Sequence, residues 1–519
     1  MNRKLSITVL AMMFSLGTMA QDIEHSVSDS IIVSTESGKV MGFQHDGSYE
    51  FLGIPYARVE RFMPPLPVEK WDTIRVCNHW GPQAMQNTWG KKLTEAEMSE
   101  NCCVLNVWTT NTSKSMPVML WLHGGGFDSG TSAWDPGHHL ARKDVVVVSV
   151  NHRLNILGFL DLSACSERYK YSGNVGMLDV VQALQWIQKN IRQFGGDPNN
   201  VTIFGESGGG GKVGTLLCMP PAKGLFHKAI IMSGTILNVN TKAMTEELGQ
   251  AVLKELHIDP AHIERINDVP YEELYAAGQR AMAASIGTRK PGTPMMWGFG
   301  PTPDGEMLLQ QPFQNGFADI STDIPIMIGT TFNELQRLRY DQSITMDEAR
   351  QELINTFGEE TDDYIKAFAE AYPDYTPQDL LSIDWLFRPK TIITADEIAE
   401  SRQAKTWMYM FTKRSDVNKG SVHGAELKYC FDNIDTSTPE HPSVGLADAM
   451  SSIWARFATV GDPNTSWLPD TWHPYTKENG ELLELGDKLQ FHHNHDRRLA
   501  EIIDRHCFKQ LDEFRRTHQ

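Results

Sequence analysis

The sequence predicts an α/β fold in which helices cover a mostly parallel sheet. Short β-type runs alternate with helical patterns along the chain, and no internal repeat or low-complexity linker divides it. Val118–Leu122, Val145–Val150 and Val201–Phe204 have the apolar composition of buried strands, whereas Leu178–Phe194 has helical spacing. We therefore expect a single domain over residues 21–519.

Two helical segments interrupt this alternation, at residues 241–288 and 345–394. Ligands of open parallel sheets bind beyond the carboxyl ends of the strands. We expect both segments to be insertions into the single domain that lie beside such a ligand site.

Residues 1–20 have the pattern of an export signal. A basic start, Asn2-Arg3-Lys4, precedes an apolar run over residues 5–16, and Thr18-Met19-Ala20 offers the small residues that signal peptidase reads. We expect cleavage before Gln21 and a periplasmic or secreted protein, with an uncleaved anchor as the alternative. No later segment approaches the roughly 20 apolar residues that a membrane span needs, so we expect no membrane insertion after cleavage.

Composition and charge favour a soluble globular protein and disfavour a nucleic-acid partner. Hydrophobic residues make up 41% of the chain and charged residues 22%. The formal net charge is −18, and removal of Arg3 and Lys4 with the signal would make it −20. An acidic surface repels nucleic acid and anionic membranes. The oligomeric state is left open.

The seven cysteines neither build a disulfide framework nor suggest zinc, because no CxxC pair is present and an odd count leaves one thiol unpaired. We expect no metal and no organic cofactor. The cysteines are Cys77, Cys102, Cys103, Cys165, Cys218, Cys430 and Cys507.

The sharpest local motif is Gly205-Glu-Ser207-Gly-Gly209, which directly follows the predicted strand Val201–Phe204. A strand that runs into G-x-S-x-G is typical of a nucleophile elbow, where glycines permit a strained turn that exposes the serine hydroxyl. Without this context, a G-x-S-x-G pentapeptide would often have only a structural role. The preceding strand and the Gly-rich start of a helix favour Ser207 as a nucleophile, in the α/β-hydrolase arrangement.

A second glycine motif, His123-Gly-Gly-Gly126, follows the predicted strand Val118–Leu122. Glycines let a backbone approach a substrate and direct its amides toward an oxyanion. The alternative is an ordinary turn, but an HGGG segment about 80 residues before G-x-S-x-G is a specific pairing. The serine also needs a histidine base and an acid, and this fold places them in the order Ser, acid, His. We expect the rate to rise with pH near the histidine pKa of about 6.5.

Further motifs extend along most of the chain, and together they resemble the type-B carboxylesterase and cholinesterase family. The resemblance covers roughly residues 31–510. It rests on Phe51–Ala57, Ser99–Cys102, Leu105–Val107, Asn151–Leu154, Leu157–Leu160, Gly195–Pro198, Gly205–Ser207, Gly224–His227, Ser233–Thr235, Pro301–Gly305, His423–Glu426 and Trp454–Asn464.

The resemblance implies the remaining catalytic residues. It places the acid at Glu334, in Gly329-Thr-Thr-Phe-Asn-Glu334, and the base at His423. It assigns the oxyanion donors to the amides of Gly125, Gly126 and Gly208. The family usually has Ala at the last position, and Gly should keep the backbone donor while loosening the turn.

Other implied features depart from the family pattern or have two interpretations. The usual disulfide partner of Cys102 is replaced by Ala84, so a bridge from Cys77 to Cys102 or Cys103 is a guess.

Glu206 either favours cationic substrates or anchors the elbow, and Trp89 either binds a cation or packs. In the family, the stretch around Met295, Trp297 and Phe299 closes the acyl pocket, and we expect Trp297 to be its wall. Finally, His492–Asp496 could hold a metal, but no two of its histidines have helical i, i+4 spacing, and we expect a solvated turn.

The expected activity is that of a serine ester hydrolase that acts through an acyl-enzyme on small to medium carboxylic esters. A feruloyl or carbohydrate-ester esterase and a serine amidase are alternatives on the same fold. A non-catalytic binding protein is a further alternative, disfavoured because an unused triad has no structural reason to stay complete.

Overall fold

A computed structural model describes residues 30–87, 93–94, 96–235, 239–288, 298–335, 343–415, 420–435, 437 and 443–506. The predicted signal, Trp89, Met295, Trp297 and Cys507 lie outside these residues. In the described part, no helix is both long and apolar enough to cross a membrane.

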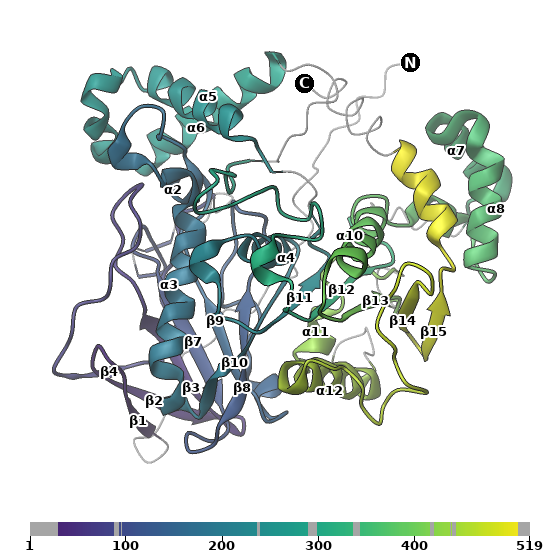
Figure 1. Ribbon diagram of the computed structural model, residues 1–519, viewed down its shortest axis with the longest axis horizontal. Coiled ribbons are helices and arrows are strands. Elements are labelled where there is room, and N and C mark those ends of the chain that lie inside the picture. The colour runs from purple at the N-terminus through teal and green to yellow at the C-terminus, as the bar shows by residue number, and fades with distance from the viewer. Residues whose placement is uncertain are drawn as a thin grey trace.

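A large mixed sheet forms the centre of the molecule (Figure 1). Its central strands are parallel and lie in the order β9 (Val146–Val150), β8 (Met116–Leu122), β10 (Gly196–Glu206), β11 (Lys228–Met232), β12 (Ile326–Thr331), β13 (Thr406–Phe411) and β14 (Glu481–Leu485). One edge is antiparallel and holds β1 (Ser30–Ser34), β2 (Lys39–His45), β3 (Ser48–Pro55) and β7 (Val104–Thr109), with the short β4 (Ile74–Val76) paired to β2. The other edge ends in the antiparallel β15 (Leu489–His493).

The parallel strands are buried on both faces. Every residue of β8 is buried, and alternate side chains enter two separate cores. Leu120 belongs to the core on the side of α3 (Val175–Asn190), whereas Trp121 belongs to the core on the side of α12 (Val444–Val460). Because strand side chains alternate between faces, a continuous apolar run is what a sheet covered on both sides requires. This confirms the predicted α/β architecture, including the strands and the helix named above.

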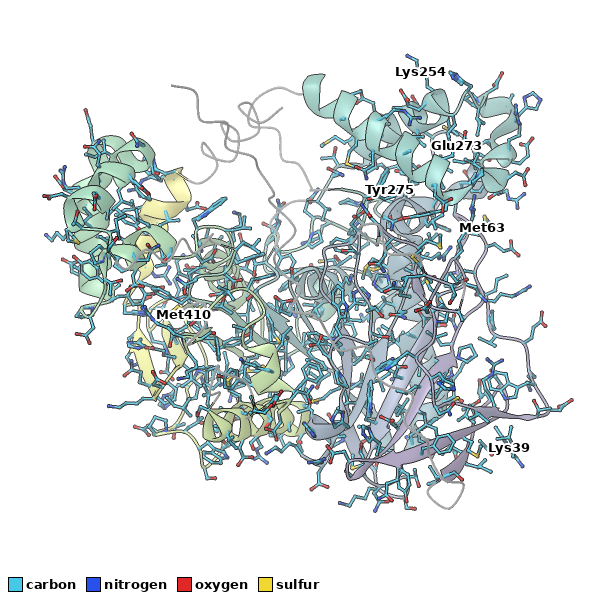
Figure 2. The ribbon with its side chains drawn as sticks, turned by 180° about the vertical axis from the view of Figure 1, so that it is seen from behind. Lys39, Met63, Lys254, Glu273, Tyr275 and Met410 are labelled. Carbon is cyan, nitrogen blue, oxygen red and sulfur yellow. The ribbon has the colours of Figure 1, made fainter. Side chains whose placement is uncertain are left out.

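Two groups of helices lie at opposite sides of the molecule (Figure 1). One contains α5 (Lys242–Glu255) and α6 (Tyr271–Thr288). The other contains α7 (Met346–Phe357), α8 (Thr361–Ala371) and α9 (Pro377–Ser382), followed by α10 (Arg388–Ser401). In Figure 2, Tyr275 lies on the edge of α6 that faces the body of the protein, and its hydroxyl forms a hydrogen bond with Asp128, two residues after the HGGG segment.

The expected solvated turn at His492–Asp496 is correct only in part. Residues 494–496 form a turn, but His492 and His493 belong to β15, and Asp496 is 4% exposed. The guanidinium of Arg388 donates to both Asp496 oxygens, over 2.8 and 2.9 Å, and the Tyr372 hydroxyl donates to one of them over 3.1 Å. This ion pair ties the start of α10 to the segment after β15, and it keeps the pKa of Asp496 well below its usual range despite burial.

We expect Arg388→Met to destabilise the fold strongly, because it leaves Asp496 buried without a counter-charge. The cost for such a broken pair is about 3–5 kcal/mol. Arg498→Met, which removes a half-exposed guanidinium paired with the exposed Asp363, should change stability by no more than ~0.5 kcal/mol. Urea unfolding of the two variants measures both. Equal stability of the two variants would show that the buried pair contributes nothing specific.

Candidate active site

Ser207 stands at the sharp turn between β10 and α4 (Gly208–Leu216). Its φ and ψ of 57° and −125° are strained for a residue with a side chain. Neighbouring glycines make the turn possible: a Cβ on Gly209 would lie 1.9 Å from the carbonyl oxygen of Leu122, the last residue of β8. The helix therefore begins in direct backbone contact with the neighbouring strand, and Ser207 is only partly buried at that point.

Glu334 and His423 come together after β12 and β13, respectively. The chain pairs here as a parallel bridge between Glu334 and Val422, and the His423 amide donates to the Glu334 carbonyl over 3.1 Å. One Glu334 carboxylate oxygen accepts from the Thr331 amide over 2.7 Å, and the other lies 2.5 Å from Nδ1 of His423. The imidazole also stacks on Phe387, with ring centroids 5.4 Å apart and planes at 3°. The carboxylate and the ring are thus both fixed in orientation.

The second ring nitrogen of His423, Nε2, faces the elbow. Because Nδ1 is bound to Glu334, Nε2 is the nitrogen available to take a proton. It lies 3.1 Å from an oxygen of Glu206, the residue directly before Ser207. Within the described residues, Nε2 forms no hydrogen bond with the Ser207 hydroxyl. Such bonds are often long or poorly aligned without substrate, and the Glu206 contact brings the ring to the serine's own segment of chain.

The HGGG segment packs directly on the first turn of α4. Gly125 and Gly126 have φ values of 85° and 64°, which favour glycine. A Cβ on Gly208 would lie 2.2 to 2.4 Å from backbone atoms of Gly126. Glycine at 208 therefore lets the two backbones approach more closely than an alanine, the usual residue of the resembling family, would allow. The expected effect of this glycine was a looser turn; its effect in the structure is this close backbone contact.

Three amides at this junction are available to a ligand. Gly208 is the first residue of α4, so its N–H has no partner inside the helix. In the part of the chain that the structure describes, the N–H groups of Gly125 and Gly126 donate to no protein acceptor. Unpaired amides beside a serine hydroxyl are suited to bind a developing oxyanion.

Buried carboxyl groups dominate the electrostatics around His423. Burial alone would lower the pKa of the imidazole, but the negative charges of Glu206 and Glu334 raise it by more, to about 10. Burial raises the pKa of Glu206 to about 7, an effect that His423 opposes and Glu334 increases. The pKa of Glu426 rises well above its usual range for the same reason, burial first and then the charges of Glu206 and Glu334.

The sequence pattern did not identify Glu426 or Lys212 as members of this environment. Glu426 ends the His423–Glu426 motif, and both of its carboxyl oxygens are buried with no hydrogen-bond partner among the described residues. Lys212 lies on α4 with its side chain fully buried. A lysine in the glycine-rich segment after the elbow is the one sequence signal that could have singled out this residue.

The expected pocket and disulfide residues have different outcomes. Phe299 is 3% exposed and packs against α6 near Gly278, so its role as a pocket wall stays a prediction, as do those of Met295 and Trp297 outside the described residues. Cys77, Cys102 and Cys103 are buried free thiols. The guessed bridge from Cys77 is therefore wrong.

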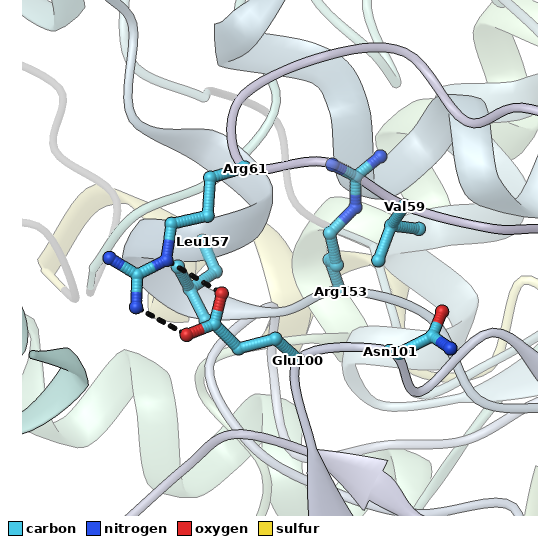
Figure 3. Close-up of a pocket in the computed structure, with 6 residues that line it drawn as sticks. All are labelled: Val59, Arg61, Glu100, Asn101, Arg153 and Leu157. Carbon is cyan, nitrogen blue, oxygen red and sulfur yellow. Dashed lines mark hydrogen bonds and ion pairs between the residues drawn. The ribbon is translucent and has the colours of Figure 1, made fainter. Parts of the chain in front are cut away.

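Neither a cavity near Arg61 nor a His-Asp cluster offers a second reactive site. The cavity, of about 100 Å³, is lined by none of Ser207, Glu334 and His423. The guanidinium of Arg61 in its lining is already bound by Glu100 (Figure 3) and by the backbone carbonyls of Asn267 and Val269. The cavity is lined by Val59, Arg61, Glu100, Asn101, Arg153 and Leu157. Among the described residues, ligand-like spacing occurs at Asp46, His138 and His139. The Asp46 carboxylate is occupied there, because it already binds His139 and Arg142.

Comparisons with known proteins point to one family. A family model described as the carboxylesterase family matches residues 29–501. Para-nitrobenzyl esterase of Bacillus subtilis (strain 168) is 34% identical over 490 residues, which cover 88% of this chain and 95% of that protein. Fumonisin B1 esterase of Sphingopyxis macrogoltabida is 32% identical over 515 residues, which cover 93% and 91%.

Solved structures give the same result. An esterase from the anaerobe Clostridium hathewayi, which can hydrolyze aliphatic aromatic polyesters, superposes with a TM-score of 0.82 at 34% identity over 92% of this chain and 98% of that one. A para-nitrobenzyl esterase superposes with a TM-score of 0.73 at 31% identity over 91% and 99%.

The contact between Glu206 and His423 changes the expected pH dependence. The imidazole must be neutral to accept a proton, so kcat/KM should rise with pH through an apparent pKa above the expected value of about 6.5. Glu206→Gln removes a negative charge 3.1 Å from Nε2 and should move this rise to lower pH by about 1 to 3 units.

Glu481→Gln is the matched control, because Glu481 is a buried carboxylate of β14 that lies near His473 and His493 rather than His423. It should leave the profile in place. The measurement is kcat/KM between pH 5 and 10. A profile of Glu206→Gln that coincides with that of the unmodified enzyme would mean that Glu206 does not act on the charge of the imidazole.

Proposed function

This chain belongs to the carboxylesterase family and is a carboxylic ester hydrolase, and on that premise we propose that Ser207, His423 and Glu334 carry the reaction through an acyl-enzyme. The observation that supports this most directly is the 2.5 Å contact between Glu334 and Nδ1 of His423. It leaves Nε2 directed at the segment that carries Ser207. The strained elbow and the unpaired glycine amides complete the set of groups that acyl transfer needs.

Acylation begins when the Ser207 hydroxyl attacks the carbonyl carbon of the ester. Nε2 of His423 takes the hydroxyl proton, and the carbonyl oxygen becomes an oxyanion bound by the amides of Gly125, Gly126 and Gly208. Glu334 keeps the imidazole in the required tautomer and stabilises the imidazolium. The intermediate then expels the alcohol, which leaves with the proton from His423, and the acyl group stays on Ser207.

Deacylation repeats these steps with water. His423 takes a proton from a water molecule, the resulting hydroxide attacks the acyl carbonyl, and the same amides bind the second oxyanion. Collapse of this intermediate returns the proton to Ser207 and releases the carboxylic acid. No step needs a metal or an organic cofactor.

We extend the proposal to the substrate and the compartment. Small to medium carboxylic esters are supported by the bulky Met295–Phe299 stretch that the family places at the acyl pocket. Export to the periplasm or the medium is supported by the basic, apolar and small-residue pattern of residues 1–20. The acidic net charge of −18 supports a small-molecule partner rather than a nucleic acid.

Ser207→Ala should leave the fold intact and abolish covalent labelling by an organophosphonate. Activity should fall on the order of 10⁴-fold or more, because the nucleophile is lost. Ser451→Ala, which changes a buried serine of α12, is the control and should label normally. Intact-protein mass spectrometry measures the label. Label retained on Ser207→Ala would rule out Ser207 as the nucleophile.

Trp297→Ala tests the acyl pocket. If Trp297 is the wall, the variant should stay stable and gain relative kcat/KM for longer acyl chains, by up to ~0.8 kcal/mol for each methylene accommodated. If Trp297 packs in a core, the variant should lose about 3–5 kcal/mol of stability. Acetyl, butyryl and hexanoyl esters together with thermal unfolding distinguish the two. An unchanged chain-length preference would remove Trp297 from the pocket.

A further inference from the structure

Lys212 is a buried lysine beside the proposed nucleophile and the glycine loop. It lies on α4, five residues after Ser207, and its side chain is fully buried. Its Nζ donates to the carbonyl oxygen of His123 over 2.8 Å and lies 5.9 Å from the centre of the Phe127 ring. Among the described residues no carboxylate forms an ion pair with it, although buried ammonium groups usually have one.

The His123 carbonyl belongs to the peptide that joins the end of β8 to the glycine loop. β8 ends at Leu122, so this carbonyl has left the sheet, and Lys212 supplies its hydrogen bond. The His123 side chain makes two further contacts that hold this peptide in place. Nδ1 of His123 donates to the Gly124 carbonyl over 2.8 Å, and the ring stacks on His152 with centroids 5.4 Å apart.

Burial makes this arrangement unfavourable for stability alone. An ammonium without a counter-charge loses its hydration on folding, and burial lowers the pKa of Lys212 to about 7. The same burial, followed by the charge of Lys212, lowers the pKa of both His123 and His152. An apolar side chain of similar length would fill the space without these costs. A lysine here therefore needs a reason beyond packing.

We propose that Lys212 is a positioning residue of the oxyanion hole, which fixes the peptide after β8 so that the Gly125 and Gly126 amides point at the reacting oxygen. This rests on the proposed function, in which those amides bind the oxyanion. The lysine acts through the loop and touches neither the substrate nor Ser207. It links the helix that begins at the nucleophile to the loop that carries the donors, so the two parts of the site keep a fixed spacing.

Lys212→Met is the first test, because Met keeps an unbranched side chain and removes the donor and the charge. For a nitrophenyl ester, kcat should fall about 10- to 100-fold, less than the loss of a whole oxyanion donor, while KM changes by less than about 3-fold. The Ki of a trifluoromethyl ketone, whose adduct with a serine hydroxyl carries an oxyanion, should rise in proportion to the loss in kcat/KM. The melting temperature should stay equal or increase.

Lys228→Met is the matched control. Lys228 is also a buried lysine, at the start of β11, and its Nζ is bound by the Asn200 side chain. The variant should keep wild-type kcat and Ki. If Lys212→Met does not fold, Lys212→Gln, which keeps an N–H donor on a shorter side chain, is measured in the same way, and its kcat and its affinity for the trifluoromethyl ketone should fall by the same factor.

The outcomes are separable. Wild-type kcat and Ki in a folded Lys212→Met would overturn the proposal and leave Lys212 as a core residue, and so would a loss of melting temperature alone. An equal loss of kcat in Lys228→Met would also overturn it, since the effect would be general to buried lysines. A wild-type enzyme that the trifluoromethyl ketone does not inhibit would instead contradict the proposed function itself.

Discussion

Direct backbone contact between the first turn of α4 and the loop after β8 is the constraint on which the rest of the site depends. Gly209 lies against the Leu122 carbonyl and Gly208 against Gly126, with no space for a side chain at either place. This contact sets the distance between the Ser207 hydroxyl and the amides of the glycine loop. Because β8 and β10 are neighbouring parallel strands of the sheet, the rigid core determines that distance.

The second determinant is the concentration of acid around one imidazole. Glu334 holds Nδ1 and Glu206 lies beside Nε2, so His423 is bound by a carboxyl group on each side. Each acid stabilises the imidazolium, which in the proposed mechanism forms when His423 accepts the serine proton. The same stabilisation makes the resting base harder to deprotonate. Burial of Glu206 reduces this second effect. It raises the pKa of the Glu206 carboxyl to about 7, so this carboxyl carries less negative charge beside Nε2 near neutral pH.

Local motifs made much of this predictable. The strand before Gly205–Gly209 and the strand before His123–Gly126 were sufficient to predict the elbow and the glycine loop, because both features are encoded in contiguous residues. Glu334 and His423 needed a resemblance, because nothing in their neighbouring sequence distinguishes them from other acids and histidines. The contact of Lys212 with His123, 89 residues away, and that of Arg388 with Asp496, 108 residues away, depend on tertiary packing. No pattern of spacing reports such contacts, so Asp496 was placed in a solvated turn.

The order of the strands along the chain determines when the enzyme becomes complete during synthesis. β8, β10 and α4 are made within the first 216 residues, so a nascent chain contains the serine and the glycine loop well before the imidazole. The proposed base, His423, follows β12 and β13 in the chain. A chain that ends before this residue has the proposed nucleophile and oxyanion donors but no group to accept the serine proton. On the proposed mechanism, hydrolytic activity therefore requires that the segment carrying His423 has docked against the sheet.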